Sequence, residues 1–391
     1  MINLIKSTFY NEEGTKKKLC EFIKGSKHLS MGKKCGEFEH AFSKYQGRKY
    51  SVMFNSGSSA NLALTQSLVN LSLLKRGDKA GFSSLTWSTN VMPLIQADLE
   101  PVPIDVSLKS VNVDSKNLLQ VLENTDLSAL FITNLLGFCA DIDKISKICK
   151  EKGILLIEDN CESLGSTLNN KKLGNFGLAS SFSFFVGHHM STIEGGMVCT
   201  DDEEIYNMLL MVRAHGWDRN LDSKRQDKIR KENNIDDFHA KYTFYCLGYN
   251  LRPTEINAFL GLEQLNYIGE ITKIRSKNFG LFHNVAKKNR DFYDLDVSHM
   301  SFVSNFAYPL VCKDGDLFDE YKRRFVDNCI EIRPIVAGSM VEQPFFRNLN
   351  KGKVYKCENA KKANDFGFYF PNFPEMNAEE KNLIVDLLKS G

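Results

Sequence analysis

Residues 50–200 alternate between short apolar runs and longer segments with helical periodicity. Short apolar runs are typical of strands that are buried on both faces, as in parallel sheets. The expected strands are residues 51–54, 80–83, 101–104, 129–133, 154–158, 181–185 and 196–200, and the expected helices are residues 58–74, 88–97 and 141–152. This alternation predicts an α/β fold with a mostly parallel central sheet and helices on both faces.

The remainder of the chain is less regular. Residues 218–242 are polar, have few apolar anchors and indicate a long insertion. Further helices are expected over residues 253–265, 281–288, 317–328 and 378–389, and a strand over residues 307–312. We therefore expect a large domain over residues 1–270, including an N-terminal arm, and a smaller α+β domain over residues 271–391.

Composition narrows the class of protein. The 391 residues carry a net charge of +2, with 42% hydrophobic and 25% charged residues, so neither nucleic acid nor an anionic membrane is an expected partner. No apolar run approaches the roughly 18 residues of a membrane span, and the first residues lack a signal-peptide layout, so a cytoplasmic location is expected. The 10 cysteines include no Cys-x-x-Cys pair, which favours reduced thiols over disulfides or a zinc site.

A glycine turn, Ser56-Gly57-Ser58, joins the first expected strand to the first expected helix. A helix N-terminus exposes backbone N–H groups at the positive end of the helix dipole, and two serine hydroxyls stand beside them here. This arrangement suits a bound phosphate. An ordinary N-cap serine with a turn glycine would leave the same pattern, so the motif decides nothing alone.

Two further residues follow expected strands, where open α/β sheets bind ligands. Asp159 ends a buried apolar strand, and its carboxylate needs a partner such as a protonated ring nitrogen, a helix N-terminus or a salt bridge. Trp87 could stack on a planar ring or simply belong to the core. Each residue therefore has both a functional and a structural interpretation.

Several basic and polar side chains could contact an anionic substrate. Guanidinium groups bind phosphate in bidentate fashion, and a histidine near them could assist, although such residues often tie loops together instead. The candidates are His215, Arg219, Asn250, Arg252 and Arg333. No spacing rule assigns a separate role to each arginine.

Adjacent histidines, His188 and His189, lie between the last two expected strands. Imidazole titrates near neutral pH, so either side chain can carry a proton during a reaction. Adjacent histidines rarely point the same way, and no third ligand stands at a useful spacing, so no metal is expected.

Several segments in this order resemble the DegT/DnrJ/EryC1/StrS aminotransferase family over nearly the whole chain. They are Gly36-Glu37-Phe38-Glu39, Asn55-Ser56-Gly57-Ser58, residues 158–165, residues 183–196 and Gly248-Tyr249-Asn250-Leu251-Arg252-Pro253. The resemblance implies fold type I architecture, similar to aspartate aminotransferase, and pyridoxal 5′-phosphate (PLP) as cofactor. It also implies a homodimer with shared active sites.

The family pattern assigns roles to matching positions of this chain. By resemblance, the cofactor phosphate would be held by Gly57, Ser58 and Ser183, and by Asn250 from a neighbouring subunit. Trp87 would stack on the pyridine ring, Asp159 would pair with its nitrogen, and Glu162 would lie near its hydroxyl. Glu162 stands where the family often has glutamine.

His188 departs from the family, because it occupies the position of the lysine that bonds covalently to PLP. The register of the family motifs favours His188 over His189 as the residue that moves protons. Histidine-bearing relatives imply a 3-dehydratase that uses non-covalently held PLP and pyridoxamine 5′-phosphate (PMP), with L-glutamate as amino donor. The implied substrate is a GDP-linked 4-keto-6-deoxy sugar, a hexose or a heptose, for dideoxysugars of lipopolysaccharide or capsule. An aminotransferase that uses another lysine, Lys171 or Lys172, and an inactive cofactor-binding relative remain alternatives.

Overall fold

A computed structural model describes residues 1–389 of the chain. Its centre is a seven-stranded sheet with the order β1-β9-β8-β5-β4-β2-β3. Only β9 runs against the other strands, because it pairs antiparallel with both β8 and β1. The strands are β1 (Tyr50–Phe54), β2 (Lys79–Ser83), β3 (Glu100–Ile104), β4 (Ala129–Thr133), β5 (Leu155–Asp159), β8 (Ala179–Ser183) and β9 (Gly196–Thr200). The mostly parallel sheet confirms the expected α/β class.

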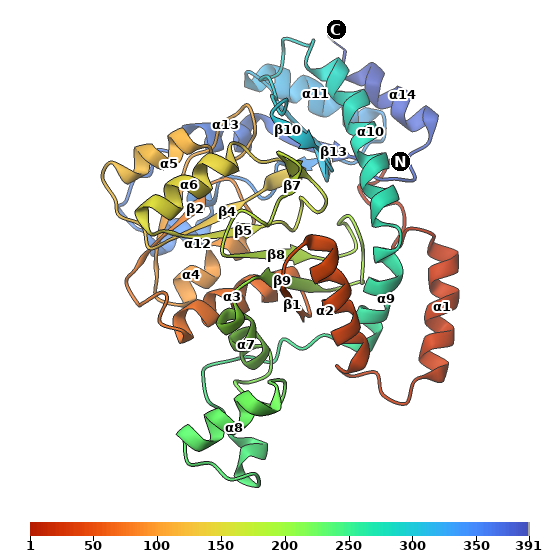
Figure 1. The fold of residues 1–391 in the computed structure, drawn as a ribbon. Coiled ribbons are helices and arrows are strands. Elements are labelled where there is room, and N and C mark those ends of the chain that lie inside the picture. The colour runs from red at the N-terminus through yellow and green to blue at the C-terminus, as the bar shows by residue number, and fades with distance from the viewer. Residues whose placement is uncertain (390–391) are drawn as a thin grey trace.

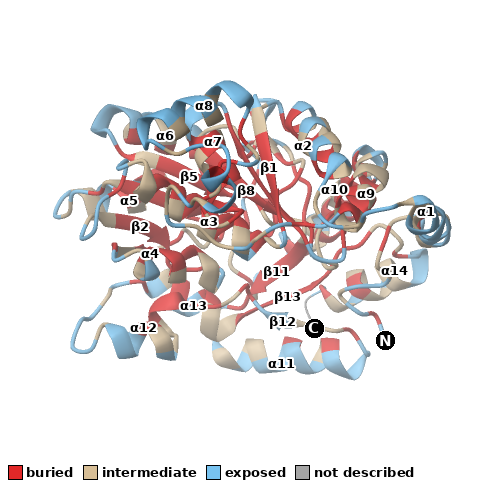
Figure 2. Ribbon diagram, turned by 90° about the horizontal axis from the view of Figure 1, so that it is seen from below, coloured by how far each residue is buried: buried red, intermediate tan, exposed pale blue. Residues whose placement is uncertain are grey.

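Helices cover both faces of this sheet (Figure 1). On one side lie α3 (Gly57–Asn70), α4 (Met92–Gln96) and α7 (Glu203–Val212), and on the other lie α5 (Ser115–Leu122) and α6 (Ile142–Lys152). Because of this double cover, the central strands are buried almost throughout, as Figure 2 shows. α2 (Lys33–Gln46) adds an aromatic cluster, in which the Phe42 ring lies 5.1 Å from that of Phe182 on β8.

Local sequence sets several helix ends. α3 begins after Ser56, whose side chain accepts a hydrogen bond from the Ser59 N–H. α6 ends at Gly153, which has φ 68°, a left-handed conformation that glycine adopts without strain. The helix expected over residues 88–97 is divided into a 3₁₀ turn, η1 (Ser88–Asn90), and α4. Pro93 lies in the first turn of α4, where its missing N–H breaks no helical hydrogen bond.

A second, antiparallel sheet organises the C-terminal part. It has the order β11-β13-β12, formed by β11 (Ala307–Val311), β13 (Gly367–Pro371) and β12 (Arg333–Pro334). Around it lie α10 (Ile268–Ala286), α11 (Gly315–Asp327), α13 (Glu358–Phe366) and α14 (Ala378–Leu387). The expected domain boundary at residue 270 falls in the first turn of α10 and stays a prediction.

The N-terminal arm does not stay with the large sheet. The Ile2 N–H donates to the Cys329 carbonyl at 2.8 Å, and the Ile2 carbonyl accepts from the Glu331 N–H at 2.9 Å. The first residues of the arm therefore pair with the C-terminal part, whereas the expected large domain included the arm. A short three-stranded sheet links the same two parts. It has the order β10 (Met300–Phe302), β6 (Thr167–Leu168) and β7 (Lys171–Lys172), and Met300 of β10 pairs with Leu168 of β6.

Residues 218–242, expected as an irregular insertion, contain a helix. α8 (Ser223–Glu232) buries none of its residues and projects away from the sheet in Figure 1. The other elements are α1 (Glu12–Gly25), β6 (Thr167–Leu168), β7 (Lys171–Lys172), α9 (Glu255–Leu265), β10 (Met300–Phe302), α12 (Pro344–Leu349) and the 3₁₀ turns η2 (Leu135–Gly137), η3 (His239–Tyr242) and η4 (Met340–Glu342). None of the helices within residues 1–389 is long and apolar enough to cross a membrane.

Candidate active site

A cavity of about 960 Å³ lies where the parallel strands end. Its walls are formed by strand ends of the large sheet, the loop after β8, the C-terminal sheet β11-β13-β12 and residues 3–5 of the N-terminal arm. Eight of the residues singled out in the sequence line it: Gly57, Ser58, Trp87, Asp159, Glu162, Ser183, His188 and Arg333. This placement follows from the parallel sheet, because the carboxyl ends of parallel strands meet at one edge.

The N-terminus of α3 forms one end of the cavity. Ser56 caps the helix by accepting a hydrogen bond from the Ser59 N–H at 3.0 Å. The N–H groups of Gly57 and Ser58 precede the first intrahelical hydrogen bond, so they have no acceptor within the helix. A Cβ on Gly57 would lie 2.7 Å from the Cβ of Ser183, so glycine permits this close approach. These N–H groups and hydroxyls fit a phosphate.

Asp159 ends β5 and lines the cavity with only 6% of its surface exposed. Its carboxylate accepts hydrogen bonds from Asn61 Nδ2 at 3.0 Å and from the Cys161 N–H at 2.9 Å. Both donors are neutral, and none of the ion pairs within residues 1–389 includes Asp159. A buried carboxylate in this position is stabilised by a cationic ligand group, such as a protonated ring nitrogen.

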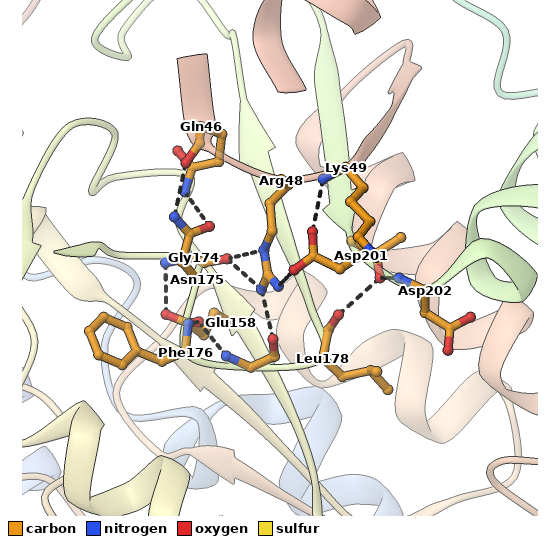
Figure 3. Close-up of polar contacts among 12 residues, drawn as sticks. Gln46, Arg48, Lys49, Glu158, Gly174, Asn175, Phe176, Leu178, Asp201 and Asp202 are labelled. Atoms are coloured by element: carbon orange, nitrogen blue, oxygen red, sulfur yellow. Dashed lines mark hydrogen bonds and ion pairs between the residues drawn. The ribbon is translucent and has the colours of Figure 1, made fainter. Parts of the chain in front are cut away.

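Glu158, the preceding residue, points to the opposite face of β5, because side chains alternate along a strand. Its carboxylate accepts hydrogen bonds from the N–H groups of Gly174 at 2.8 Å, Phe176 at 2.6 Å and Gly177 at 2.8 Å (Figure 3). Asn134 Nδ2 adds a fourth at 3.1 Å. Each oxygen of this buried carboxylate accepts two hydrogen bonds, which hold residues 174–177 against β5.

Glu162 and Trp87 offer different contacts to a bound ring. Burial, with a smaller effect of the nearby Asp159 charge, raises the pKa of Glu162 to about 8. The carboxyl is therefore protonated at neutral pH and can donate an O–H, while one of its oxygens accepts from the Leu136 N–H at 2.8 Å. Trp87 is 51% exposed, so it is not a core tryptophan, and its indole can stack on a planar ligand.

The structure separates the two adjacent histidines. His188 lines the cavity, and its ring lies 5.2 Å from that of Phe306. Burial and the Arg275 guanidinium lower the pKa of His188 to about 4, so the imidazole is neutral at pH 7. Neutral imidazole is the form that can accept a proton, although the lowered pKa makes it a weaker base and its protonated form a stronger acid. His189 is 3% exposed, is absent from the cavity wall and uses Nε2 to donate to the Ser304 carbonyl at 2.9 Å.

Four residues expected to contact cofactor or substrate lie outside the walls of this cavity. They are His215, Arg219, Asn250 and Arg252. Asn250 Oδ1 accepts from Arg252 Nε at 2.9 Å, so these two are tied to each other. Arg219 packs its guanidinium over the Trp217 ring at 3.9 Å. The segment 214–252 therefore presents its polar groups elsewhere on the single chain.

Arg333 does line the cavity, and Glu331 Oε1 accepts from its guanidinium at 2.7 Å. The other Glu331 oxygen accepts from the Leu4 N–H at 2.9 Å, so one carboxylate fixes both Arg333 and the arm. Sequence reasoning missed several wall residues: Asn3, Leu4, Ile5, Glu194, Phe306, Glu331, Tyr369 and Asn372. Asn61, which donates to Asp159 without lining the cavity, was also missed, although its place one turn beyond Gly57 on the same helix was a usable signal.

The chain matches the model of the DegT/DnrJ/EryC1/StrS aminotransferase family over residues 11–389. It is 34% identical over 385 residues to GDP-4-keto-6-deoxy-D-mannose 3-dehydratase of Escherichia coli O55:H7, with 95% of this chain and 96% of that protein covered. The enzyme of the same name from Yersinia pseudotuberculosis is 35% identical over 374 residues, with 93% of each chain covered. GDP-perosamine synthase of Caulobacter vibrioides is 30% identical over 254 residues, 65% of this chain and 62% of that one.

Solved structures agree with these similarities. The E. coli GDP-4-keto-6-deoxy-D-mannose-3-dehydratase with bound hydrated PLP superimposes with a TM-score of 0.88 at 32% identity, covering 100% of this chain and 99% of that one. A GDP-4-keto-6-deoxymannose-3-dehydratase with a trapped PLP-glutamate geminal diamine gives a TM-score of 0.87 at 32% identity, with 100% of both chains covered. The chain therefore belongs to the DegT/DnrJ/EryC1/StrS aminotransferase family.

Proposed function

We propose that the chain is a 3-dehydratase of a GDP-linked 4-keto-6-deoxy sugar that uses PLP and PMP held without a covalent bond. The observation that carries this proposal is the cavity wall, which within residues 1–389 includes His188 and no lysine. An imidazole can move a proton, but it cannot form the bond that a lysine amine makes with the PLP aldehyde. The similarity to two enzymes named 3-dehydratases supports the same reading.

The cavity residues fit a phosphorylated pyridine. The unpaired N–H groups at the α3 N-terminus suit the phosphate, and the buried carboxylate without a cationic partner suits the protonated ring nitrogen. The exposed indole suits the ring face, and the protonated carboxyl can donate to the oxygen on the ring. The residues are Gly57, Ser58 and Ser183 for the phosphate, Asp159 for the nitrogen, Trp87 for stacking and Glu162 for the ring oxygen.

The proposed chemistry needs one side chain that moves a proton in both directions. When bound, PLP or PMP supplies an electron sink for the electron pair left by a departing proton. His188 is neutral because burial and Arg275 lower its pKa to about 4, so it can accept that proton. The resulting imidazolium can then give the proton to the C3 hydroxyl, which leaves as water. L-Glutamate supplies the next amino group, and ammonia is released with the 3-deoxy-4-keto sugar.

The substrate assignment rests on the relatives. GDP and a 6-deoxymannose skeleton come from the names of the similar enzymes, and a GDP-4-keto-6-deoxy-heptose would meet the same chemical requirements. Arg333 lies in the cavity wall and offers a guanidinium to an anionic substrate. The heptose therefore stays the second candidate for the same reaction.

We also propose that two chains share their active sites. Large apolar side chains at residues 238–247 are exposed, which is typical of a surface that contacts another protein: Phe238 73%, Tyr242 77%, Phe244 55% and Leu247 70%. A second copy packed there would receive Asn250 near its cofactor phosphate, and His215, Arg219 and Arg252 near its substrate. A twofold dimer is the commonest arrangement that joins identical surfaces.

An aminotransferase is the alternative within the same fold, and the similarity to GDP-perosamine synthase favours it. It requires a lysine at the cofactor. Lys171 and Lys172 lie on β7, outside the cavity wall. Lys172 is half-buried and packs its amine over the Tyr45 ring at 3.7 Å. An inactive cofactor-binding relative would keep the cavity but catalyse neither reaction.

The decisive experiment combines product mass with chemical trapping. The protein is incubated with PLP, L-glutamate and either GDP-4-keto-6-deoxymannose or the heptose analogue. We expect a product that has lost one oxygen, and we expect borohydride to trap no PLP on lysine in the resting protein. His188→Gln should lower the rate by about 10²- to 10⁴-fold. His40→Gln, at an exposed position on α2, is the matched control. A product that has gained an amine, or a trapped lysine, would favour the aminotransferase.

A further inference from the structure

His189 is a buried histidine with no part in the reaction proposed above. Its Nε2–H donates to the Ser304 carbonyl at 2.9 Å, which joins the loop after β8 to the start of the C-terminal part. The N–H of Ser304 in turn donates to Ser166 Oγ at 2.9 Å. His189 therefore connects the loop that carries His188 with a segment that is fixed independently of that loop.

The segment 304–306 is held on several sides. The Phe306 N–H and Asn305 Nδ2 both donate to the Leu136 carbonyl, at 3.0 Å and 2.8 Å. Arg275, on α10, donates to the Phe306 carbonyl at 2.8 Å. Leu136 has φ 58°, an unusual conformation for a bulky residue, which persists where surrounding contacts enforce it. The backbone that carries the Phe306 ring is therefore rigidly placed.

The Phe306 ring is what the segment presents to the active site. It lines the cavity and lies 5.2 Å from the His188 ring, while the Phe185 ring lies 6.0 Å from His188 on the same loop. Apolar contact of this kind removes water from the imidazole, which keeps it neutral and limits its rotation. The packing of Phe306 against His188 requires that the loop after β8 and residues 304–306 keep the same position relative to each other.

We propose that His189 is a positioning residue: its hydrogen bond to Ser304 keeps the Phe306 ring packed against His188. This inference rests on the proposed function of His188 and deepens it. In this proposal His189 has a structural role and transfers no proton, because its Nε2–H is hydrogen-bonded to the Ser304 carbonyl and the residue is absent from the cavity wall.

The test measures the His188 titration directly. Protein labelled with ¹⁵N-histidine, free of cofactor, is titrated by NMR, and His188 is assigned through a His188→Gln sample. His189→Leu keeps a similar volume but removes the donor, whereas His189→Gln retains a donor near the position of Nε2. In His189→Leu the His188 loop is no longer tied to Ser304, so His188 can move away from the Phe306 ring and become hydrated. Its pKa should then rise from about 4 toward the ordinary 6.5, at least about tenfold in the protonation constant.

The titration must be read with the charges around His188 in mind. Arg275 faces it from α10 and lowers its pKa, and neither variant changes that residue. The other ionisable groups of the cavity wall are Asp159, Cys161, Glu162, Glu194, Glu331, Arg333 and Tyr369. A smaller pocket that His188 also lines adds Lys6, Tyr10 and Glu375. All of them are present in wild type and in both variants, so the difference between His189→Leu and His189→Gln isolates the hydrogen bond.

Activity provides the second readout. In His189→Leu we expect kcat to fall about tenfold or more with an unchanged KM, because the base is misplaced while the sugar site is intact. His189→Gln should restore most of the rate. If His189→Leu does not fold, Phe306→Leu tests the same contact without altering any backbone hydrogen bond, and the His188 pKa should rise there too.

Unchanged His188 titration and kcat in His189→Leu would overturn the inference, as would equal impairment of the Gln and Leu variants. If the wild-type protein dehydrates no sugar, the proposed function fails, but the cofactor-free titration still decides the positioning role of His189.

Discussion

Glu158 and Asp159 are consecutive carboxylates at the end of β5, and their surroundings differ sharply. Glu158 faces residues 174–177 and accepts hydrogen bonds from three backbone N–H groups and one amide. Asp159 faces the cavity and accepts from two neutral donors. Burial is nearly complete for both, at 0% and 6% exposed. The two faces of one strand thus contain one carboxylate with two donors at each oxygen and one with a single donor at each oxygen beside a cavity.

Glu158 and Asp159 differ in a property that can separate a structural acid from a functional one. Burial does not distinguish them, because both side chains are inaccessible. The difference lies in the number of donors and in position: Glu158 accepts two hydrogen bonds at each oxygen from its own fold, whereas Asp159 accepts one at each oxygen and lines a large cavity. Substitution of each acid by its amide should therefore affect different properties.

The largest effect is expected for Asp159→Asn. The amide keeps the size of the side chain but cannot neutralise a protonated ring nitrogen, so PLP affinity should fall by about 4 kcal/mol, close to a thousandfold. The melting temperature without cofactor should change little, because the Asn61 amide can turn and accept from the new NH₂ group while the other oxygen still accepts from the Cys161 N–H. Absorbance titration with PLP measures the affinity. Wild-type PLP affinity in this variant would contradict the assigned role.

Glu158→Gln should show the reverse pattern. Its NH₂ group would face backbone N–H donors that the carboxylate now satisfies, so the free energy of unfolding should drop by about 3 kcal/mol. Among molecules that remain folded, PLP affinity should stay within a few-fold of wild type. Urea denaturation and PLP titration on the same samples separate the two quantities. A large loss of affinity with intact stability would show that the far face also serves the cofactor.

Glu162 provides the most specific test. Its pKa is raised from 4.5 to about 8, so between these pH values the folded protein retains a proton that the unfolded chain has released. The free energy of unfolding should therefore decrease as pH rises through this range, by at most about 1.4 kcal/mol per pH unit. Glu162→Gln should flatten that part of the curve. Parallel slopes in wild type and variant would mean that this carboxyl is ionised at neutral pH.

Much of the fold was predictable from sequence, because several of its strands are mostly apolar. The segments expected as strands at residues 129–133 and 196–200 coincide with β4 and β9. The strand expected over residues 181–185 ends earlier, at Ser183, because Phe184 turns into the aromatic cluster around Phe38 and Phe42. Periodicity alone does not tell a residue in a sheet from an equally buried aromatic residue just beyond it.

The candidate site was predictable where it follows strand ends and helix starts. Trp87 and Asp159 come after expected strands, so a parallel sheet brings them to one edge, where Ser183 ends β8. The wall formed by Phe306, Arg333 and the N-terminal arm had no local pattern. It depends on contacts between distant parts of the chain, such as Leu4 with Glu331.

The sequence by itself determined the α/β class, the order of the strands along the chain and the replacement of lysine by His188, because these follow from local apolar patterns and from residue identity. Only the tertiary structure decided which of two neighbouring acids faces the cavity and which of two adjacent histidines is a wall residue. It also decided that the N-terminal arm closes one side of the cavity. These choices depend on which donors and rings the packed chain places around each side chain, and no local sequence pattern encodes them.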